Sequence, residues 1–376
     1  MTMKDLRAIS EILFRRDTSQ SISHRCLLIF QWQALGRISE ISSMKWADIG
    51  FRNSYIEALQ VNLNRSKNNS QQDLLIFLHS SDWIACPLHA LFSLIVCKVD
   101  SSNRIFDCIP PNGESKYVNS LLLSIYEEVM QSSNDLRITP NMRSHSGRSG
   151  PTTAASEHPQ MQPHWLIPRG GWTLDSIQTL FSYIRCTNTT DSRVARSLSE
   201  WPNLEAGGQP PSPKGLPMED RELFSRFAYT ITSHIDISKD LREILTCVGC
   251  MYYNEVRQSY PNCSLIRVME TCDNSPGVEV LGQWSRDFRK QFIRINGPYL
   301  RRTLLQGEDL IDVTTLDQHM SDSRNAIVAL SSNIAELKQA HSDEIQNLKQ
   351  AHSDEIQKLK QAHSDEIQNL KQAHSD

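Results

Sequence analysis

The residues best suited to chemistry lie in one stretch, from Arg143 to Ile184, that mixes cationic, aromatic and hydroxyl side chains. Its arginines, histidines, tryptophans and late tyrosine are Arg143, Arg148, Arg169, His145, His158, His164, Trp165, Trp172 and Tyr183. Guanidinium groups bind phosphate oxygens through paired hydrogen bonds, and a tyrosine hydroxyl can act as a nucleophile. The stretch therefore suits an enzyme that acts on a phosphate ester. The alternative is an ordinary surface loop followed by an amphipathic helix.

Length and composition restrict the class of protein. The chain has 376 residues and a net charge of −4, which allows a sizeable core and predicts two domains. Its first 200 residues carry 20 Lys and Arg against 18 Asp and Glu, a balance that permits a local basic cleft for DNA. No apolar run is long enough for a transmembrane helix, and the N-terminus lacks the apolar core of a signal peptide. We expect a soluble intracellular protein with no membrane partner.

Nine cysteines in such a chain are expected to be reduced thiols. The spacing of Cys247 and Cys250, with Cys263 and Cys272 further on, invites a zinc interpretation. The first two lie within a helical apolar pattern, however, where small thiols fill a core. Core packing is therefore the preferred interpretation, and no metal is expected.

The elements that must position the chemical residues can be traced from the N-terminus. Residues 4–50 predict a helix, a turn and a second helix, followed by a short third helix from Ile38 to Trp46. The pattern then changes to two strands, Ser54–Leu63 and Asp73–Leu78, joined by the polar hairpin tip Asn64–Ser70. Pro87 opens another helix, because its missing N–H costs nothing at a first-turn position, and residues 117–131 form one more. The fold class predicted is mostly α with a small antiparallel sheet.

The second half of the chain divides by composition. Residues 201–218 contain five prolines and three glycines and predict a linker or extended strap without packed structure. Residues 219–312 predict a helical domain with four helical patterns. The last pattern places Trp284, Phe288 and Phe292 on one face and cations on the other, which we interpret as a solvated face rather than a DNA-contacting one.

The C-terminal residues 313–376 predict a coiled coil. Apolar residues follow a heptad pattern from Leu316 to Leu337, with one polar interruption at Ser323. An eleven-residue unit then repeats, with leucine at 337, 348, 359 and 370. Eleven residues in three turns predict a nearly straight or weakly right-handed helix. The expected function of this tail is self-association.

Four pieces of the first 200 residues occur in order: Leu35-Gly36-Arg37-Ile38-Ser39-Glu40, Lys67, His145-Ser146-Gly147-Arg148, and Arg169-Gly170-Gly171-Trp172 ahead of Tyr183. In this order they resemble a tyrosine recombinase. LGRISEISSMKWADI resembles the first-arginine box of that family, and CPLHALFSLI resembles the helix after its lysine hairpin. More narrowly, SHSGRSGPTTAA and WLIPRGGWTLDSIQTLFSYI resemble the integrases of Crypton-type transposons, which are eukaryotic mobile elements. The resemblance covers roughly residues 5–200 and implies a catalytic domain over residues 1–200.

The resemblance implies site-specific cleavage and rejoining of double-stranded DNA in the nucleus, without a metal or other cofactor. Arg37 and Arg148 would hold the non-bridging phosphate oxygens. His145 would lie beside them as a hydrogen-bond donor or proton acceptor. Trp172 fills a position where the family has His or Trp, and would supply an indole N–H and packing.

Two further residues complete the implied site. Lys67, on the hairpin tip, would act as the general acid that protonates the leaving 5′ oxygen. Tyr183 would be the nucleophile and would form a 3′-phosphotyrosyl link. The remaining polar and aromatic residues of the stretch, Arg143, His158, His164, Arg169 and Trp165, would serve as scaffold and spacing.

The sequence also departs from the family pattern. Gly147 stands where the family usually has a bulky apolar residue, and Trp172 lies eleven residues before Tyr183, a slightly long gap. Only about twenty-four residues precede the helix that contains Arg25, so we expect the usual N-terminal DNA-clamping domain to be missing. DNA affinity should then be reduced and steeply salt-sensitive.

Four of these residues also have simpler explanations. Arg37 could form only an ion pair with Glu40, and Lys67 could be a solvated loop residue, with Arg65 as a rival for its role. Trp172 could belong to the core, and Tyr183 could anchor an amphipathic helix. The alternative functions are a catalytically silent DNA-binding or coiled-coil scaffold protein derived from such an element, and a coiled-coil adaptor with no role on DNA.

The repeat generates a first prediction. A chain that lacks residues 313–376 should lose self-association in the absence of DNA, because the heptad and eleven-residue patterns supply the apolar seam. Light scattering coupled to size-exclusion chromatography measures the mass of both chains. Equal oligomeric states for the intact and shortened chains would contradict the prediction.

Overall fold

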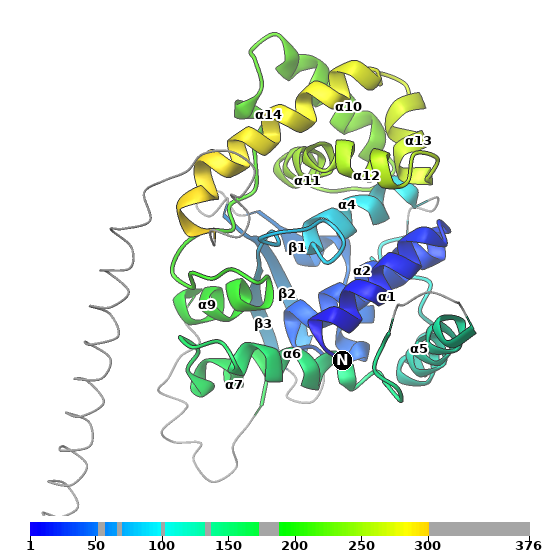
Figure 1. The fold of residues 1–376 in the computed structure, drawn as a ribbon, viewed down its shortest axis with the longest axis vertical. Coiled ribbons are helices and arrows are strands. Elements are labelled where there is room, and N and C mark those ends of the chain that lie inside the picture. The colour runs from blue at the N-terminus through cyan, green and yellow to red at the C-terminus, as the bar shows by residue number, and fades with distance from the viewer. Residues whose placement is uncertain (52–56, 66–69, 99–101, 132–136, 173–187, 301–376) are drawn as a thin grey trace, which may run out of the picture. The chain divides into compact units, whose positions relative to one another are not determined.

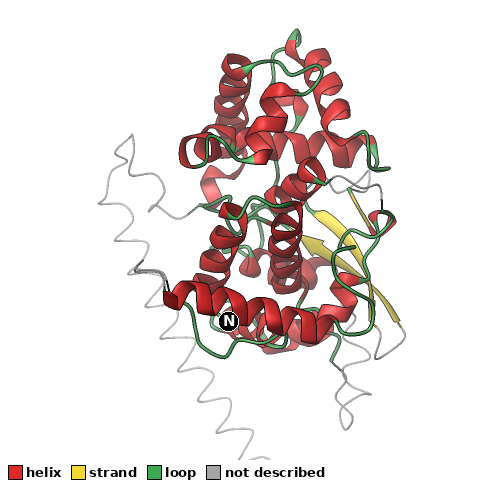
Figure 2. Cartoon of the chain, turned by 90° about the vertical axis from the view of Figure 1, so that its right-hand side faces the viewer, coloured by secondary structure: helices red, strands yellow, loops and turns green. Residues whose placement is uncertain are grey.

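The computed structural model of the protein describes residues 1–51, 57–65, 70–98, 102–131, 137–172 and 188–300. These residues belong to one compact unit, Met1–Leu304. The unit is mostly helical and contains a three-stranded antiparallel sheet (Figures 1 and 2). The predicted fold class, mostly α with a small antiparallel sheet, is therefore confirmed.

Two helices form the centre of the first part of the chain. Helix α1 spans Met3–Arg15, and a capping box between Thr2 and Asp5 closes its first turn. Helix α2 spans Ser19–Ala34 and is buried along nearly its whole length. Helix α2 packs against α1, α4 (Pro87–Cys97) and α6 (Ser146–Ser156), so the surrounding helices determine its position. Helix α2 is capped at its C-terminal end by Leu35, whose backbone is left-handed with a φ of 47°. Gly36 and Arg37 follow directly.

The sheet has the order β1-β2-β3, with β1 at Ile49–Gly50, β2 at Leu59–Arg65 and β3 at Ser70–Ile76. Leu59 pairs with Ile76 and Arg65 pairs with Ser70. The hairpin therefore extends closer to its tip than the sequence predicted. Polar side chains do not prevent this extension, because strand pairing uses backbone groups and Asn64 is exposed on the outer face. Strand β1 was not expected.

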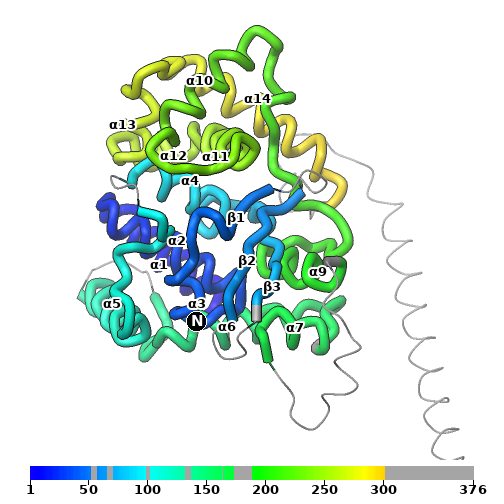
Figure 3. Tube along the Cα trace, turned by 180° about the vertical axis from the view of Figure 1, so that it is seen from behind, coloured from blue at the N-terminus to red at the C-terminus, as the bar shows by residue number. Residues whose placement is uncertain are grey.

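The other helices of the first part surround the sheet and α2: α3 (Ile38–Ser42), α4 (Pro87–Cys97), α5 (Glu114–Gln131), α6 (Ser146–Ser156), α7 (Pro163–Gly170) and α9 (Asn188–Leu198). The third helix is shorter than predicted, because α3 ends at Ser42 and a separate 3-10 turn, η1, covers Trp46–Asp48. Figure 3 shows α9 alongside β3, with α6 and α7 near the ends of β2 and β3. The segments that carry Arg37, Arg65, Arg148 and Trp172 therefore lie close to one another.

The helical region after residue 219 contains α10 (Asp220–Thr232), α11 (Lys239–Met251), α12 (Tyr253–Ser259), α13 (Ser264–Thr271) and α14 (Val278–Asn296), with short 3-10 turns η2 at Pro213–Gly215 and η3 at Gly297–Tyr299. Five α-helices thus replace the four predicted, because the backbone breaks at Tyr252 between α11 and α12. On α14 the aromatic residues Trp284, Phe288 and Phe292 are buried, as expected. Cys247 and Cys250 are also fully buried, within α11.

The segment 201–218 is packed, which corrects the prediction of an unpacked linker. Trp201 is fully buried, and its indole N–H donates to the carbonyl of Leu78 at 2.7 Å. Gly208, with φ of 95°, brings its backbone against the ring of Phe77, where a Cβ would lie 2.5 Å from the nearest ring atom. The side-chain oxygen of Asn296, on α14, accepts from the Gly208 N–H at 3.0 Å. The prolines and glycines of this segment therefore allow the backbone to pack closely against the core, and they do not form an unpacked linker.

A second contact joins the two parts of the unit through the turn between α1 and α2. The carboxylate of Asp17 accepts hydrogen bonds from the Ser264 N–H at 2.9 Å and from the Ser264 hydroxyl at 3.0 Å, at the start of α13. Nearby, the rings of Phe14, Trp83 and Tyr260 meet edge to face. The first part and the helical region therefore share one core.

The predicted coiled coil, residues 313–376, lies outside the described residues. Within residues 1–300, apart from the gaps given above, no helix combines the length and the apolar character that a membrane span requires.

The Asp17 contact generates a second prediction. Asp17→Ala should lower the free energy of unfolding by about 1–2 kcal/mol through loss of the cap at α13. Alanine also fits poorly at the left-handed φ of 48° found here. Asp17→Asn keeps a side-chain oxygen and tolerates positive φ, so it should cost much less. Urea denaturation measures both variants, and equal losses would show that the cap contributes nothing.

Candidate active site

One buried carboxylate, Glu40 on α3, organises the predicted chemical residues. Its Oε1 accepts from the Arg37 guanidinium at 2.7 Å, and its Oε2 accepts from the Arg37 backbone N–H at 2.9 Å. Oε2 also accepts from Nη1 of Arg65 at 2.9 Å, and Nη1 of Arg148 lies 4.0 Å away. Three guanidinium groups therefore surround a single carboxylate, which leaves the cluster with a positive charge near neutral pH.

Arg37 starts α3, directly after the left-handed turn at Leu35. The ion pair with Glu40 that the sequence offered as a simpler explanation is present. The Arg37 side chain nevertheless remains 32% exposed. Glu40 thus orients a guanidinium that is still accessible to a ligand from solvent.

Arg148, on α6, is almost completely buried and incompletely satisfied. Its Nη2 donates to the carbonyl of Gly170 at 2.5 Å, and its Cζ lies 4.9 Å from the centre of the Trp172 ring. Its buried Nη1 makes no hydrogen bond. Burial first, and the charge of Arg37 second, lower the pKa of Arg148 to about 10. The group stays charged at neutral pH, and an anion would satisfy the free donor.

Trp172 reaches Arg148 because two glycines precede it. Gly171 ends α7 in a left-handed conformation with φ of 61°. A Cβ on Gly170 would lie 2.1 Å from the Trp172 ring. The indole therefore folds back over the last turn of α7 onto the guanidinium, a contact that combines packing with cation–π attraction.

His145 lies at the start of α6, one turn before Arg148. Its backbone carbonyl accepts from the N–H groups of Arg148 and Ser149 at 3.0 Å each. The imidazole is exposed. The turn between His145 and Arg148 is tightly packed at Gly147, where a Cβ would lie 2.3 Å from Oε1 of Gln31. A side chain at position 147 would therefore displace the Gln31 amide.

Lys67 and Tyr183 lie outside the described residues, within 66–69 and 173–187. The described chain reaches both segments at the arginine cluster, because Arg65 precedes the first and Trp172 precedes the second. Of the six predicted residues, the structure thus places Arg37, Arg148 and Trp172 together, and puts His145 on the same turn of α6 as Arg148.

Arg65, which the sequence offered only as a rival to Lys67, is central to the arginine cluster. Arg65 is 2% exposed and donates to Glu40, to the side chain of Gln72 at 2.7 Å, and to the backbone carbonyls of Ala34 and Arg169. The signal that could have revealed this role is the alternation of buried and outward-facing residues along β2. Leu59, Val61 and Leu63 are buried, and Arg65 is the next residue on the same side of the strand. A cation on the inward side of a strand needs buried partners.

Arg169 and Trp165 have the scaffold roles that were expected. Arg169 is fully buried and donates to the carbonyls of Gln33 and Leu75, and to the carboxylate of Asp191 at 2.5 Å. Trp165 is buried beneath the guanidinium of Arg193, 4.6 Å from its ring centre. Arg169 in this way fastens α7, and with it the Gly170–Trp172 turn, to α2 and β3.

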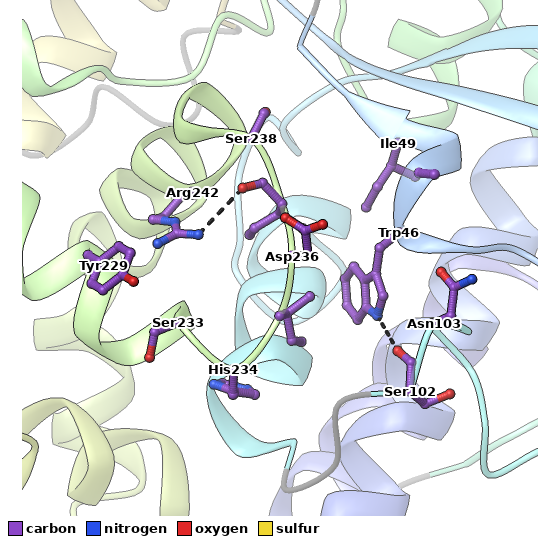
Figure 4. Close-up of a pocket in the computed structure, with 13 residues that line it drawn as sticks. Trp46, Ile49, Ser102, Asn103, Tyr229, Ser233, His234, Asp236, Ser238 and Arg242 are labelled. Atoms are coloured by element: carbon purple, nitrogen blue, oxygen red, sulfur yellow. Dashed lines mark hydrogen bonds between the residues drawn. The ribbon is translucent and has the colours of Figure 1, made fainter.

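A cleft of about 880 Å³ lies elsewhere, between Trp46 and the loop that joins α10 to α11. Figure 4 shows Trp46 and Asn103 on one side of it, facing Asp236, with Tyr229 and Arg242 beyond. Arg242 lies over the Tyr229 ring at 4.7 Å. Of the predicted site residues that the structure describes, Arg37, His145, Arg148 and Trp172, none lines this cleft. The described cavity and the arginine cluster are therefore separate features.

Glu40 generates a third prediction. Glu40→Gln keeps the shape but leaves Arg65 buried without an anion, so the free energy of unfolding should fall by about 3–5 kcal/mol at neutral pH. Glu128→Gln is the matched control, because Glu128 pairs with Arg16 at the surface with 49% of its side chain exposed. The free energy of unfolding of Glu128→Gln should be lower than that of the wild type by only about 0–1 kcal/mol.

The contribution of Glu40 to the free energy of unfolding should also depend on pH. Burial alone would raise the pKa of Glu40, but the Arg37 backbone N–H and the charge of Arg65 lower it below the usual 4.5. The stabilisation is therefore present above pH 4.5 and is lost as the pH falls through the lowered value. Denaturation across this range should show the wild type and Glu40→Gln converging in acid. Parallel curves would contradict this assignment.

Known proteins do not identify this arrangement: no protein-family model matches the chain, and no curated protein matches it. A function must therefore be argued from the side chains themselves. The feature that most suggests a function is the positively charged cluster of Arg37, Arg65 and Arg148 around Glu40. The ring of Trp172 packs against Arg148 in this cluster.

Proposed function

We propose that the protein breaks and rejoins DNA strands through a 3′-phosphotyrosyl intermediate, as a tyrosine recombinase of the Crypton-type integrase kind. The observation that carries the proposal is the pairing of Arg37 with Arg148 around Glu40, with Nη1 of Arg148 buried and lacking a hydrogen bond. A phosphate with two non-bridging oxygens matches two guanidinium groups in number and charge. The sequence resemblance supports the same reaction.

The arginines would act on the transition state. Attack on a phosphodiester concentrates negative charge on the non-bridging oxygens, and donors that are already oriented stabilise that charge without reorganising. Glu40 orients Arg37, while Gly170 and Trp172 orient Arg148. The positive surplus of the cluster favours the charged phosphate before and during the reaction.

Tyr183 and Lys67 would carry the covalent steps. The Tyr183 oxygen attacks phosphorus and forms the new P–O bond, while the bond to the 5′ oxygen breaks. Lys67 donates a proton to that 5′ oxygen, and the phenol proton passes to His145 or to water. In rejoining, a 5′ hydroxyl attacks the phosphotyrosyl link and releases Tyr183. No net oxidation occurs, and the phosphodiester bond energy is conserved.

The proposal includes double-stranded DNA as substrate, self-association through the C-terminal repeats and on DNA, and action in the nucleus. The alternative is a catalytically silent DNA-binding or scaffold protein that retains the arginine cluster as a structural remnant. The two differ in whether Tyr183 becomes covalently linked to DNA.

The fourth prediction tests this difference. The intact protein is mixed with nicked duplexes that carry a randomised core, and DNA that stays attached after denaturation is sequenced. The wild type should form adducts enriched in particular sequences, and Tyr183→Phe should form none. Arg37→Ala and Arg148→Ala should each slow adduct formation by about 10²–10³-fold, the usual cost of losing one preorganised donor.

Arg143→Ala is the matched control, because Arg143 is an exposed arginine of the same stretch with a spacing role. It should leave the adduct rate unchanged. Absence of adducts above the Tyr183→Phe background would overturn the enzymatic proposal. Salt-sensitive DNA binding that persists without adducts would instead favour the silent DNA-binding protein.

A further inference from the structure

Gln31 connects the two segments that carry the phosphate-binding arginines. It lies in the last turn of α2 and is 1% exposed. Its Nε2 donates to the carbonyl of Ser144 at 2.7 Å and, with a longer contact of 3.4 Å, to the carbonyl of Gly36. Gly36 immediately precedes Arg37, and Ser144 immediately precedes His145. One amide thus contacts the backbone directly before each half of the proposed site.

The Gln31 side chain also packs closely against Gly147. A Cβ at Gly147 would lie 2.3 Å from Oε1 of Gln31 and 2.8 Å from its Cδ. Both hydrogen-bond partners of Nε2 are carbonyl oxygens, so the orientation of the amide is determined by its contacts. The first turn of α6, which carries His145 and Arg148, therefore rests directly on the Gln31 side chain.

A second side chain holds the same peptide from the opposite direction. The backbone N–H of Ser144 donates to the side-chain oxygen of Asn119, on α5, at 2.7 Å. The amide and carbonyl of Ser144 are thus both bound by side chains from other helices. Side chains of α2 and α5 thus hold the segment before His145, in addition to the local turn in which the Ser146 N–H donates to the Arg143 carbonyl at 2.8 Å.

We propose that Gln31 is a positioning residue, which sets the separation between Arg37 and the His145–Arg148 turn by binding Gly36 and Ser144. This inference rests on the proposed phosphoryl-transfer function. It assigns catalytic importance to a residue that would touch neither DNA nor the reacting atoms. A displacement of about 1 Å between catalytic groups can cost about 10²-fold in rate.

The test compares Gln31→Met with Gln33→Met in the full-length chain. Gln33 lies on the same helix, is fully buried, and donates through its side chain to the carbonyl of Leu198 at 3.2 Å. Both variants lose a buried amide, but only Gln31 contacts the proposed site. Gln31→Met should slow adduct formation at saturating DNA about ten- to hundred-fold with little change in DNA affinity. Gln33→Met should leave the rate per folded molecule unchanged.

Coupling between residues separates positioning from general stability. In an Arg37→Ala background, the Gln31→Met change should slow the reaction much less than it does in the wild type, because the group being positioned is already gone. Equal effects of Gln31→Met and Gln33→Met, or full additivity of Gln31→Met with Arg37→Ala, would overturn the inference.

Orthovanadate supplies a readout that does not depend on the reaction. It should protect the wild type against thermal unfolding through the arginine cluster, and Gln31→Met should require about ten-fold more orthovanadate than Gln33→Met for the same protection. If the wild type binds orthovanadate but forms no adduct, the proposed function fails while this comparison still decides the role of Gln31. If the wild type binds no orthovanadate, the inference fails as well.

Discussion

The burial of Glu40 among arginines is the interaction on which the proposed site depends. Arg65 could not remain 2% exposed without an anion, because an unpaired buried charge is very costly. One carboxylate nevertheless serves Arg37, Arg65 and, at 4.0 Å, Arg148. The cluster is thus neutralised enough to fold and remains positive enough to attract an anion. Stability and the phosphate binding that we propose would both follow from this incomplete neutralisation.

Backbone geometry converts this charge arrangement into a defined site. The arginines come from α3, β2 and α6, which share no local sequence, so their separation is set by packing. Gly147 and Gly170 admit the side chains of Gln31 and Trp172 at distances that a Cβ would forbid. Buried Arg169 binds carbonyls of α2 and β3 and fastens α7 between them. Glycine contacts and hydrogen bonds from arginine to the backbone together preorganise the cluster.

The sequence by itself determined the fold class and most of the helices, although it missed strand β1 and one helix of the second half. The period of the apolar residues located the central helices and the hairpin, and Pro87 marked a helix start, because these signals act over a few neighbouring residues. The resemblance to tyrosine recombinases also named Arg37, His145, Arg148 and Trp172 as candidate chemical groups. Residues 66–69 and 173–187 lie outside the described structure, so the roles expected of Lys67 and Tyr183 remain predictions.

Only the tertiary structure decided which of these groups meet. It placed Arg65 beside Glu40, made Trp201 part of the core instead of a linker, and brought Gln31 between Gly36 and Ser144. The partners could not be read locally, because Trp201 meets Leu78 and Gln31 meets Ser144 across more than a hundred residues. Proline- and glycine-rich sequence is equally compatible with a free linker and with a close-fitting strap. Burial alone distinguishes the two, and burial is a property of the complete fold.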